Sequence, residues 1–246
     1  MKTHKAGAFL RVVAVLAVAV TAGNLAQAQS CSVEWTGNAG DSQWSTAGNW
    51  STHRVPGPTS DVCILTANGT SGSVDAIANP SIAVHSIHVA QGVGLAFGSE
   101  TVSIATSLTS QGYLTMFGTT LSATSVDMQS GTLVGGGTIE GSLTNNGYLL
   151  PTNGQTLTVT GDYTQTAGGE LSVNFATTYP PALVVKSNAT LSGTLSVGVN
   201  LKRPPAKGST YTAMTFGLLN GEFTSFTVEG GGTVKYTNNS VVVTFQ

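Results

Sequence analysis

A short unit, glycine–any residue–leucine, recurs through the middle of the chain and constrains its fold more than any other feature. It occurs five times, with starts about 16 to 24 residues apart: Gly112-Tyr113-Leu114, Gly131-Thr132-Leu133, Gly147-Tyr148-Leu149, Gly169-Glu170-Leu171 and Gly193-Thr194-Leu195. Repeats of this length are typical of proteins in which one structural unit stacks on the next. One unit cannot bury its apolar side chains alone, whereas stacked units can. The repeat therefore predicts a solenoid.

Between the glycines, apolar residues alternate with Thr, Ser and Gly, as at Leu157 and Val159 or Leu195 and Val197. This period of two is typical of a strand with one buried face. No stretch after the first thirty residues has the spacing of an amphipathic helix. We therefore expect an all-β protein, a right-handed parallel β-helix with a cap at each end. A β-sandwich of irregular hairpins is the alternative. The solenoid is favoured because the glycine and the leucine keep the same relative position in every unit, whereas hairpins could be spaced freely.

The composition excludes several classes of partner. Charged residues make up 8% of the chain, and nine Lys and Arg face eleven Asp and Glu. Nucleic-acid binding needs a basic face, and this balance of charges disfavours one. Low charge also suits stacked strands, because like charges about 4.8 Å apart would repel each other. We expect no nucleic-acid partner, and nothing in the sequence indicates a cofactor.

The first 28 residues have the pattern of a secretory signal peptide. Basic residues at the start are followed by an apolar run from Val12 to Val20 and by Ala26-Gln27-Ala28, a small-x-small cleavage pattern. The run is too short to span a bilayer, which needs about 20 apolar residues. We therefore expect a secreted mature chain that begins near Gln29, without a transmembrane segment, at the cell surface, outside the cell or in the periplasm.

Two cysteines, Cys31 and Cys63, follow this segment. In an oxidising compartment a single pair predicts one disulfide, which would stabilise the fold by roughly 3–4 kcal/mol. The alternative is that Cys31 carries a lipid anchor, since it lies just after the signal peptide. The preceding Ala28-Gln29-Ser30 lacks the leucine typical of a lipoprotein signal, so the disulfide is the favoured prediction.

The repeats also suggest how the mature chain is divided. We expect residues 29–90 to form the N-terminal cap and the first coils, 91–204 the solenoid repeats, and 205–246 the last coils and the C-terminal cap. Solenoids need caps because their end strands are otherwise unpaired.

Both ends of the mature chain carry motifs that resemble a known group of secreted proteins. They are Trp35-Thr36-Gly37, residues 40–50, Pro56 and Asp61-Val62 near the start, and residues 141–147, 157–165, 211–216 and 221–223 further on. This succession is similar to that of bacterial autotransporter passengers and related β-helix proteins with the autotransporter-associated β-strand repeat. The resemblance implies a β-helix and a surface role, without the membrane β-barrel that autotransporters carry. It specifies the fold better than the activity.

The three tryptophans of the chain, Trp35, Trp44 and Trp50, lie within one short stretch. If exposed, they would form a platform for sugar rings, whose C–H faces stack on indoles. If buried, they would plug the N-terminal end of the solenoid with large apolar side chains. Both interpretations remain open from the sequence, and the buried plug is the favoured one.

Two further patterns have the residue types of reactive sites. His85 and His88 are three residues apart in a strand-like segment, which predicts opposite faces of the strand and no shared metal ion. Gly40-Asp41-Ser42 resembles the start of some secreted serine esterases, but no histidine follows an aspartate at the spacing that such enzymes need. We interpret this motif as a turn.

β-Helices also host polysaccharide lyases and hydrolases, which use paired carboxylates or a basic residue. The acidic residues of the repeat region occur singly, at Asp75, Asp127, Glu140, Asp162 and Glu170. The one basic cluster is Lys202-Arg203-Pro204-Pro205-Ala206-Lys207, which we interpret as a solvated loop.

From these patterns we expect a secreted, non-catalytic structural or adhesin-like protein, with cell-surface or matrix glycans or proteins as its partners. A carbohydrate-binding module that uses the tryptophans is the first alternative. A polysaccharide-degrading enzyme is the second. The sequence predicts no metal ligands and no oligomeric state.

Overall fold

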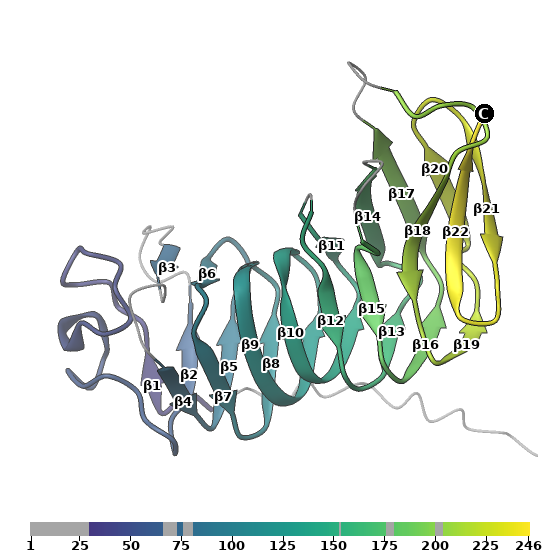
Figure 1. The fold of residues 1–246 in the computed structure, drawn as a ribbon. Coiled ribbons are helices and arrows are strands. Elements are labelled where there is room, and N and C mark those ends of the chain that lie inside the picture. Colours follow the sequence, from purple (N-terminus) through teal and green to yellow (C-terminus); the bar gives the residue numbers. More distant parts are fainter. Residues whose placement is uncertain (1–29, 66–72, 76–80, 153, 176–179, 200–203) are drawn as a thin grey trace, which may run out of the picture.

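A computed structural model describes residues 30–65, 73–75, 81–152, 154–175, 180–199 and 204–246; the predicted signal peptide, residues 1–28, lies outside them. Of residues 73–75, only the backbone is described. The described chain is all-β, with strands and one three-residue 3₁₀ helix, Ala47–Asn49. The strands form one long, mostly parallel sheet (Figure 1).

The strands fall into three series, which we call faces A, B and C. Face A comprises β3 (Ser73–Asp75), β6 (Gly94–Phe97), the starts of β9 (Tyr113–Met128) and β10 (Thr132–Asn145), β11 (Tyr148–Leu150), β14 (Glu170–Phe175), β17 (Thr194–Val199) and β20 (Ser225–Val228). Within each series, every strand pairs in parallel with the next.

Face B comprises β4 (Ser81–Val84), β7 (Thr101–Ile104), the middle parts of β9 and β10, β12 (Leu157–Val159), β15 (Leu183–Val185) and β18 (Thr210–Thr215). Face C comprises β1 (Val33–Glu34), β2 (Asp61–Ile64), β5 (Ser86–Val89), β8 (Ser107–Ser110), the ends of β9 and β10, β13 (Tyr163–Gln165), β16 (Asn188–Leu191) and β19 (Leu218–Gly221). The chain visits A, B and C in turn, coil after coil, an arrangement compatible with a β-solenoid.

The Gly-x-Leu units stack in register on face A, as the repeat predicts. Leu114 pairs with Leu133, which pairs with Leu149, and the column continues through Leu171 and Leu195. All five leucines are buried. Because side chains alternate along a strand, the residue before each leucine points outward. The repeated leucine therefore forms one continuous stripe of the core.

Gly131 and Gly193 show why each unit begins with glycine. Their φ angles are +72° and +66°, in the left-handed region that side chains disfavour. A Cβ on Gly131 would lie 2.1 Å from the carbonyl oxygen of Gly112 in the preceding coil, and a Cβ on Gly193 would lie 2.2 Å from that of Gly169. The Gly112 carbonyl also accepts a hydrogen bond from the N–H of Thr132, at 3.0 Å. Any side chain at these corners would push neighbouring coils apart.

Polar side chains also enter the core beside these corners. The hydroxyl of Tyr163 donates to Oε1 of Gln165 at 2.7 Å, and Nε2 of Gln165 donates to the carbonyl oxygens of Gly169 and Thr194. Both side chains are buried, and burial raises the pKa of Tyr163 well above its ordinary value. The amide group thus satisfies backbone carbonyls where the chain turns from face C to face A.

Among the described strands, antiparallel pairing occurs at the C-terminal end. Strands β21 (Gly232–Tyr236) and β22 (Ser240–Phe245) form a hairpin, and β22 also pairs antiparallel with β18 (Figure 1). Phe245 of this hairpin packs on Phe175, with ring centroids 4.4 Å apart. A β-sandwich of hairpins would require antiparallel pairs throughout, whereas the pairs that build faces A, B and C are parallel.

Candidate functional site

The three tryptophans come together at the N-terminal end, and all are buried. Trp50 contacts the other two edge-to-face, with ring centroids 4.9 Å from Trp35 and 4.7 Å from Trp44. Its indole N–H donates to the Trp44 carbonyl at 2.8 Å. The exposed fractions are 7% for Trp35, 2% for Trp44 and 0% for Trp50. These residues therefore do not form the exposed sugar platform considered as an alternative, because their rings cover one another.

The Gly40-Asp41-Ser42 motif lies in the loop beside this Trp cluster. One carboxylate oxygen of Asp41 accepts hydrogen bonds from Nδ2 of Asn49 at 2.6 Å and from the N–H of Gln43 at 3.0 Å. The other accepts from the Thr46 hydroxyl at 2.6 Å. These bonds lower the pKa of Asp41, and the bond from Thr46 has the largest effect. These three bonds show that the carboxylate organises a turn, as the sequence predicts.

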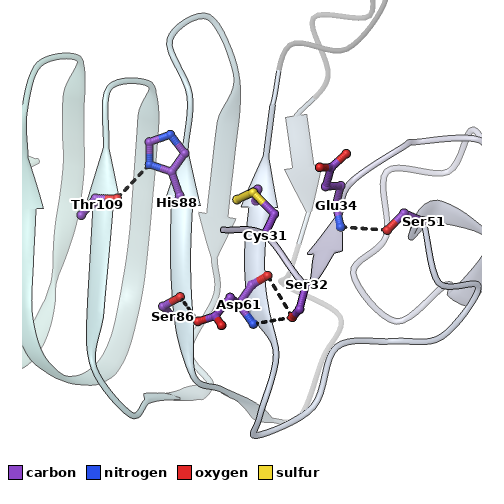
Figure 2. The surroundings of a disulfide bond; sticks show 9 residues. Cys31, Ser32, Glu34, Ser51, Asp61, Ser86, His88 and Thr109 are labelled. Carbon is purple, nitrogen blue, oxygen red and sulfur yellow. Dashed lines mark hydrogen bonds between the residues drawn. A yellow bond between two sulfur atoms is a disulfide. The ribbon is translucent and has the colours of Figure 1, made fainter. Parts of the chain in front are cut away.

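The two cysteines are joined, which confirms the predicted disulfide. Cys31 precedes β1 and Cys63 lies on β2, with Cα atoms 5.6 Å apart (Figure 2). The bond occupies the Cys31 sulfur, which a lipid anchor would need. It ties the N-terminal segment to the first full strand of face C.

A Ser–His–Asp group lies next to the disulfide, but its geometry differs from that of a catalytic triad. Oδ1 of Asp61 accepts from the Ser86 hydroxyl at 2.5 Å, and Nδ1 of His85 lies 2.7 Å from the same oxygen (Figure 2 shows Ser86 and Asp61). Both hydrogen bonds lower the pKa of Asp61, and the bond from Ser86 has the larger effect. In a triad the serine bonds to the histidine, which abstracts its proton. Here both bond to the carboxylate, and Ser86 is buried, so the group fastens β2 to β5.

The predicted placement of His85 and His88 on opposite faces is wrong. The chain bends at His85, between β4 and β5, and the bend resets the alternation, so that both side chains lie outside the core. Nδ1 of His88 lies 2.8 Å from the Thr109 hydroxyl on the next strand of face C (Figure 2), and partial burial lowers the pKa of His88. Within the described ranges, no three His, Cys, Asp or Glu residues are grouped to hold a metal ion.

The acidic residues of the repeat region are distributed over the molecule. Asp127 lies on face C, Glu140 on face B and Glu170 on face A. Asp162 lies at a corner, where its Oδ1 accepts from the Ser187 hydroxyl at 2.6 Å, a bond that lowers its pKa. The side chain of Asp75 lies outside the described residues, as do Lys202 and Arg203 of the basic cluster.

The outer surfaces of faces B and C contain rows of small polar residues. On face B, Thr101, Thr120, Thr138 and Thr158 pair in succession. On face C, Thr144, Thr164 and Thr190 do the same. These rows are the hydroxyl ladders that stacked repeats can present to solvent.

Face A differs, because aromatic and aliphatic side chains lie among the small polar ones on its outer surface from β9 to β11. Tyr113 and Phe117, both on β9, are 59% and 50% exposed. Tyr148 on β11 is half-buried and lies two strands from Tyr113, with Thr132 between them. Together with the half-buried aliphatic residues between and beside them, these form what we call the outer aromatic strip: Tyr113, Phe117, Val134, Tyr148 and Leu150.

The strip was not predicted from the sequence, although a signal for it was present there. Tyr113 and Tyr148 occupy the middle position of Gly-x-Leu units. Because the leucine of each unit faces inward, the middle residue must face outward. An aromatic residue at that position is therefore exposed once the strand pairs in register.

In the part of the chain that the structure describes, no helix has the length and hydropathy to cross a membrane. Comparisons of the sequence and fold with protein families, with curated proteins and with solved structures gave no match.

Proposed function

We propose that this protein is a secreted, non-catalytic structural protein of the cell surface or extracellular matrix, of the adhesin type. In this proposal the parallel coils form a right-handed β-helix, the segment around the Trp cluster caps its N-terminal end, and the β21–β22 hairpin caps its C-terminal end. The partners are cell-surface or matrix glycans or proteins, and the resemblance to autotransporter passengers agrees with such a role.

The observation that carries this proposal is the in-register stacking of the Gly-x-Leu units. Stacking gives each outer surface the same spacing from coil to coil, so that one type of contact can recur along the molecule. Many weak contacts in a row can sum to firm attachment. A cell-surface or matrix polymer is itself repetitive, and a repetitive protein surface suits it.

The test uses the full chain expressed with residues 1–28. We expect the protein in the culture medium or on the cell surface, and saturable binding of the purified protein to cells or matrix layers. The same protein is incubated with a panel of polysaccharides, and we expect neither new reducing ends nor unsaturated uronides. Product release would establish the polysaccharide-degrading alternative. Retention in the cytoplasm, or no binding to any layer, would contradict the proposed role.

A further inference from the structure

The outer aromatic strip places exposed aromatic side chains on the outer surface of face A, outside the core. We propose that it binds an uncharged polysaccharide chain lying across face A. This inference rests on the proposed extracellular role and names a ligand class and a site for it. The residues that contact the sugars are Tyr113, Phe117 and Tyr148, with the hydroxyls of Thr115 and Thr132 between them.

The strip carries no charged side chain, and this favours an uncharged ligand. Every outward residue of face A from β6 to β11 is uncharged: Gly94, Ala96, Tyr113, Thr115, Phe117, Thr132, Val134, Gly136, Tyr148 and Leu150. The charged residues that border this stretch are both acidic: Asp75 pairs with Ala96 in the preceding coil, and Glu170 pairs with Tyr148 in the next coil. An acidic glycan would place its anionic groups against apolar rings without a cation to pair with them, and would also face Glu170. An uncharged polysaccharide has no anionic groups, so it avoids both of these unfavourable interactions.

The neighbours of the rings leave them accessible. Tyr113 is flanked on the adjoining strands by Gly94 and Thr132, and Phe117 is paired with Gly136, so the residues directly paired with the two rings have small side chains or none. Strands are about 4.8 Å apart, which separates Tyr113 from Tyr148 by about 10 Å. Along β9, Tyr113 and Phe117 are four residues apart, about 13 Å. Rings at such distances suit successive sugar units of an extended chain better than a single small molecule.

A protein partner fits the strip less well. The strip lies on the surface of paired strands, whose backbone groups are already hydrogen-bonded, so a strand cannot be added there. Its rings are separated by Thr and Gly, whereas the centre of a protein interface is a continuous apolar patch. Sugar rings supply both the C–H faces that stack on separate aromatic rings and the hydroxyls that bond to threonines.

The inference is tested by affinity electrophoresis of the full secreted chain in native gels. The gels contain hydroxyethylcellulose or galactomannan, which are uncharged, or polygalacturonate, which is acidic. We expect retardation in at least one uncharged gel and none in polygalacturonate. Tyr113→Thr with Tyr148→Thr should weaken that retardation by tenfold or more, because each aromatic contact accounts for up to about a tenfold change in affinity. Phe117→Thr alone should weaken it less.

The matched control is Leu218→Thr, which removes an even more exposed apolar side chain (70% exposed) from face C and should change nothing. The proposal is overturned by retardation in polygalacturonate only, in no gel, or to the same degree in the double variant. It is also overturned if sedimentation velocity shows a wild-type dimer that the double variant abolishes, because a second copy would then cover the strip. If the double variant still binds to cells as the wild type does, only this inference is contradicted. Retardation of a chain that binds no cell or matrix layer would contradict only the proposed function.

Discussion

The Trp cluster and the outer aromatic strip both consist of residues that can stack on sugar rings, but their environments are opposite. The three tryptophans are nearly inaccessible to solvent. By contrast, Tyr113 is 59% exposed and Phe117 is 50% exposed. Aromatic content alone would assign the platform to the tryptophans. The comparison shows that exposure follows from the position of a residue in the fold, and not from its type.

The two regions reach these environments by different means. The tryptophans lie in loops and isolated bridges, where side-chain hydrogen bonds such as those of Asp41 and Asn49 fold the chain over the rings. The tyrosines lie on strands, where pairing with the coils on either side fixes which side chains point outward. Stability should therefore depend on the first group and ligand binding on the second.

The strongest test of this division is Trp50→Ala. The side chain is fully buried between two other indoles, so we expect a loss of about 3–5 kcal/mol in the free energy of unfolding, measured by urea denaturation. Tyr113→Ala serves as the control, and it should change the free energy by no more than about 0.5 kcal/mol. Similar losses in both variants would contradict the division.

Removing the disulfide should have the next largest effect. Cys31 and Cys63 are 32 residues apart in sequence, and opening a loop of that length costs about 3–4 kcal/mol through the entropy of the unfolded chain. We expect this loss in the double variant Cys31→Ser with Cys63→Ser. Reducing agent should destabilise the wild type and leave the variant unchanged. An equal response of both proteins would show that the bond does not support the N-terminal region.

Asn49→Ala should destabilise the loop that covers the indoles. Asn49 is fully buried, donates to Asp41 and accepts a hydrogen bond from the N–H of Ala39 at 2.9 Å. Leaving these partners unsatisfied should cost about 1–3 kcal/mol in the free energy of unfolding. Asn220→Ala, at an exposed position on face C, is the matched control and should be neutral. We also expect higher tryptophan exposure to a soluble quencher in Asn49→Ala alone.

The same loop should weaken in acid. The pKa of Asp41 is lower in the folded chain than its ordinary value of 3.8, mainly because the Thr46 hydroxyl bonds to the carboxylate. Its stabilising contribution is therefore complete above that ordinary value and is lost as the pH falls through the lowered pKa. Denaturation at pH 5 and pH 3 should show a smaller decrease for Asp41→Asn than for the wild type. An identical decrease would mean that other carboxylates, such as Asp61 and Asp162, account for the acid sensitivity.

The smallest effect on stability is expected at the outer aromatic strip. Tyr113→Thr replaces an exposed ring with a residue that also favours strands, so the midpoint of thermal unfolding should remain within error of the wild type. A marked decrease would show that the ring packs on the coil, which would remove it from the proposed binding surface. Glu170→Gln, at the border of the strip, should likewise leave the midpoint unchanged.

Much of the regular architecture could be predicted from the sequence. Gly-x-Leu phase and apolar alternation are local properties, and they predicted parallel stacking in register, which the pairing of Leu114, Leu133 and Leu149 shows. The pair Cys31 and Cys63 was also predictable, because two cysteines allow one disulfide. The relation of His85 to His88 was not, because a bend between two strands interrupts the alternation on which the prediction depended.

The sequence by itself determined the stacking unit, because a glycine corner and an inward leucine are requirements of the chain at a single position. Only the tertiary structure decided which aromatic rings are covered. Burial of Trp50 depends on contacts with Trp35, Trp44 and a loop carbonyl, and the exposure of Tyr113 depends on glycine and threonine in the neighbouring coils. Exposure is a property of neighbours that are distant in sequence, and those neighbours are known only when the coils are placed side by side.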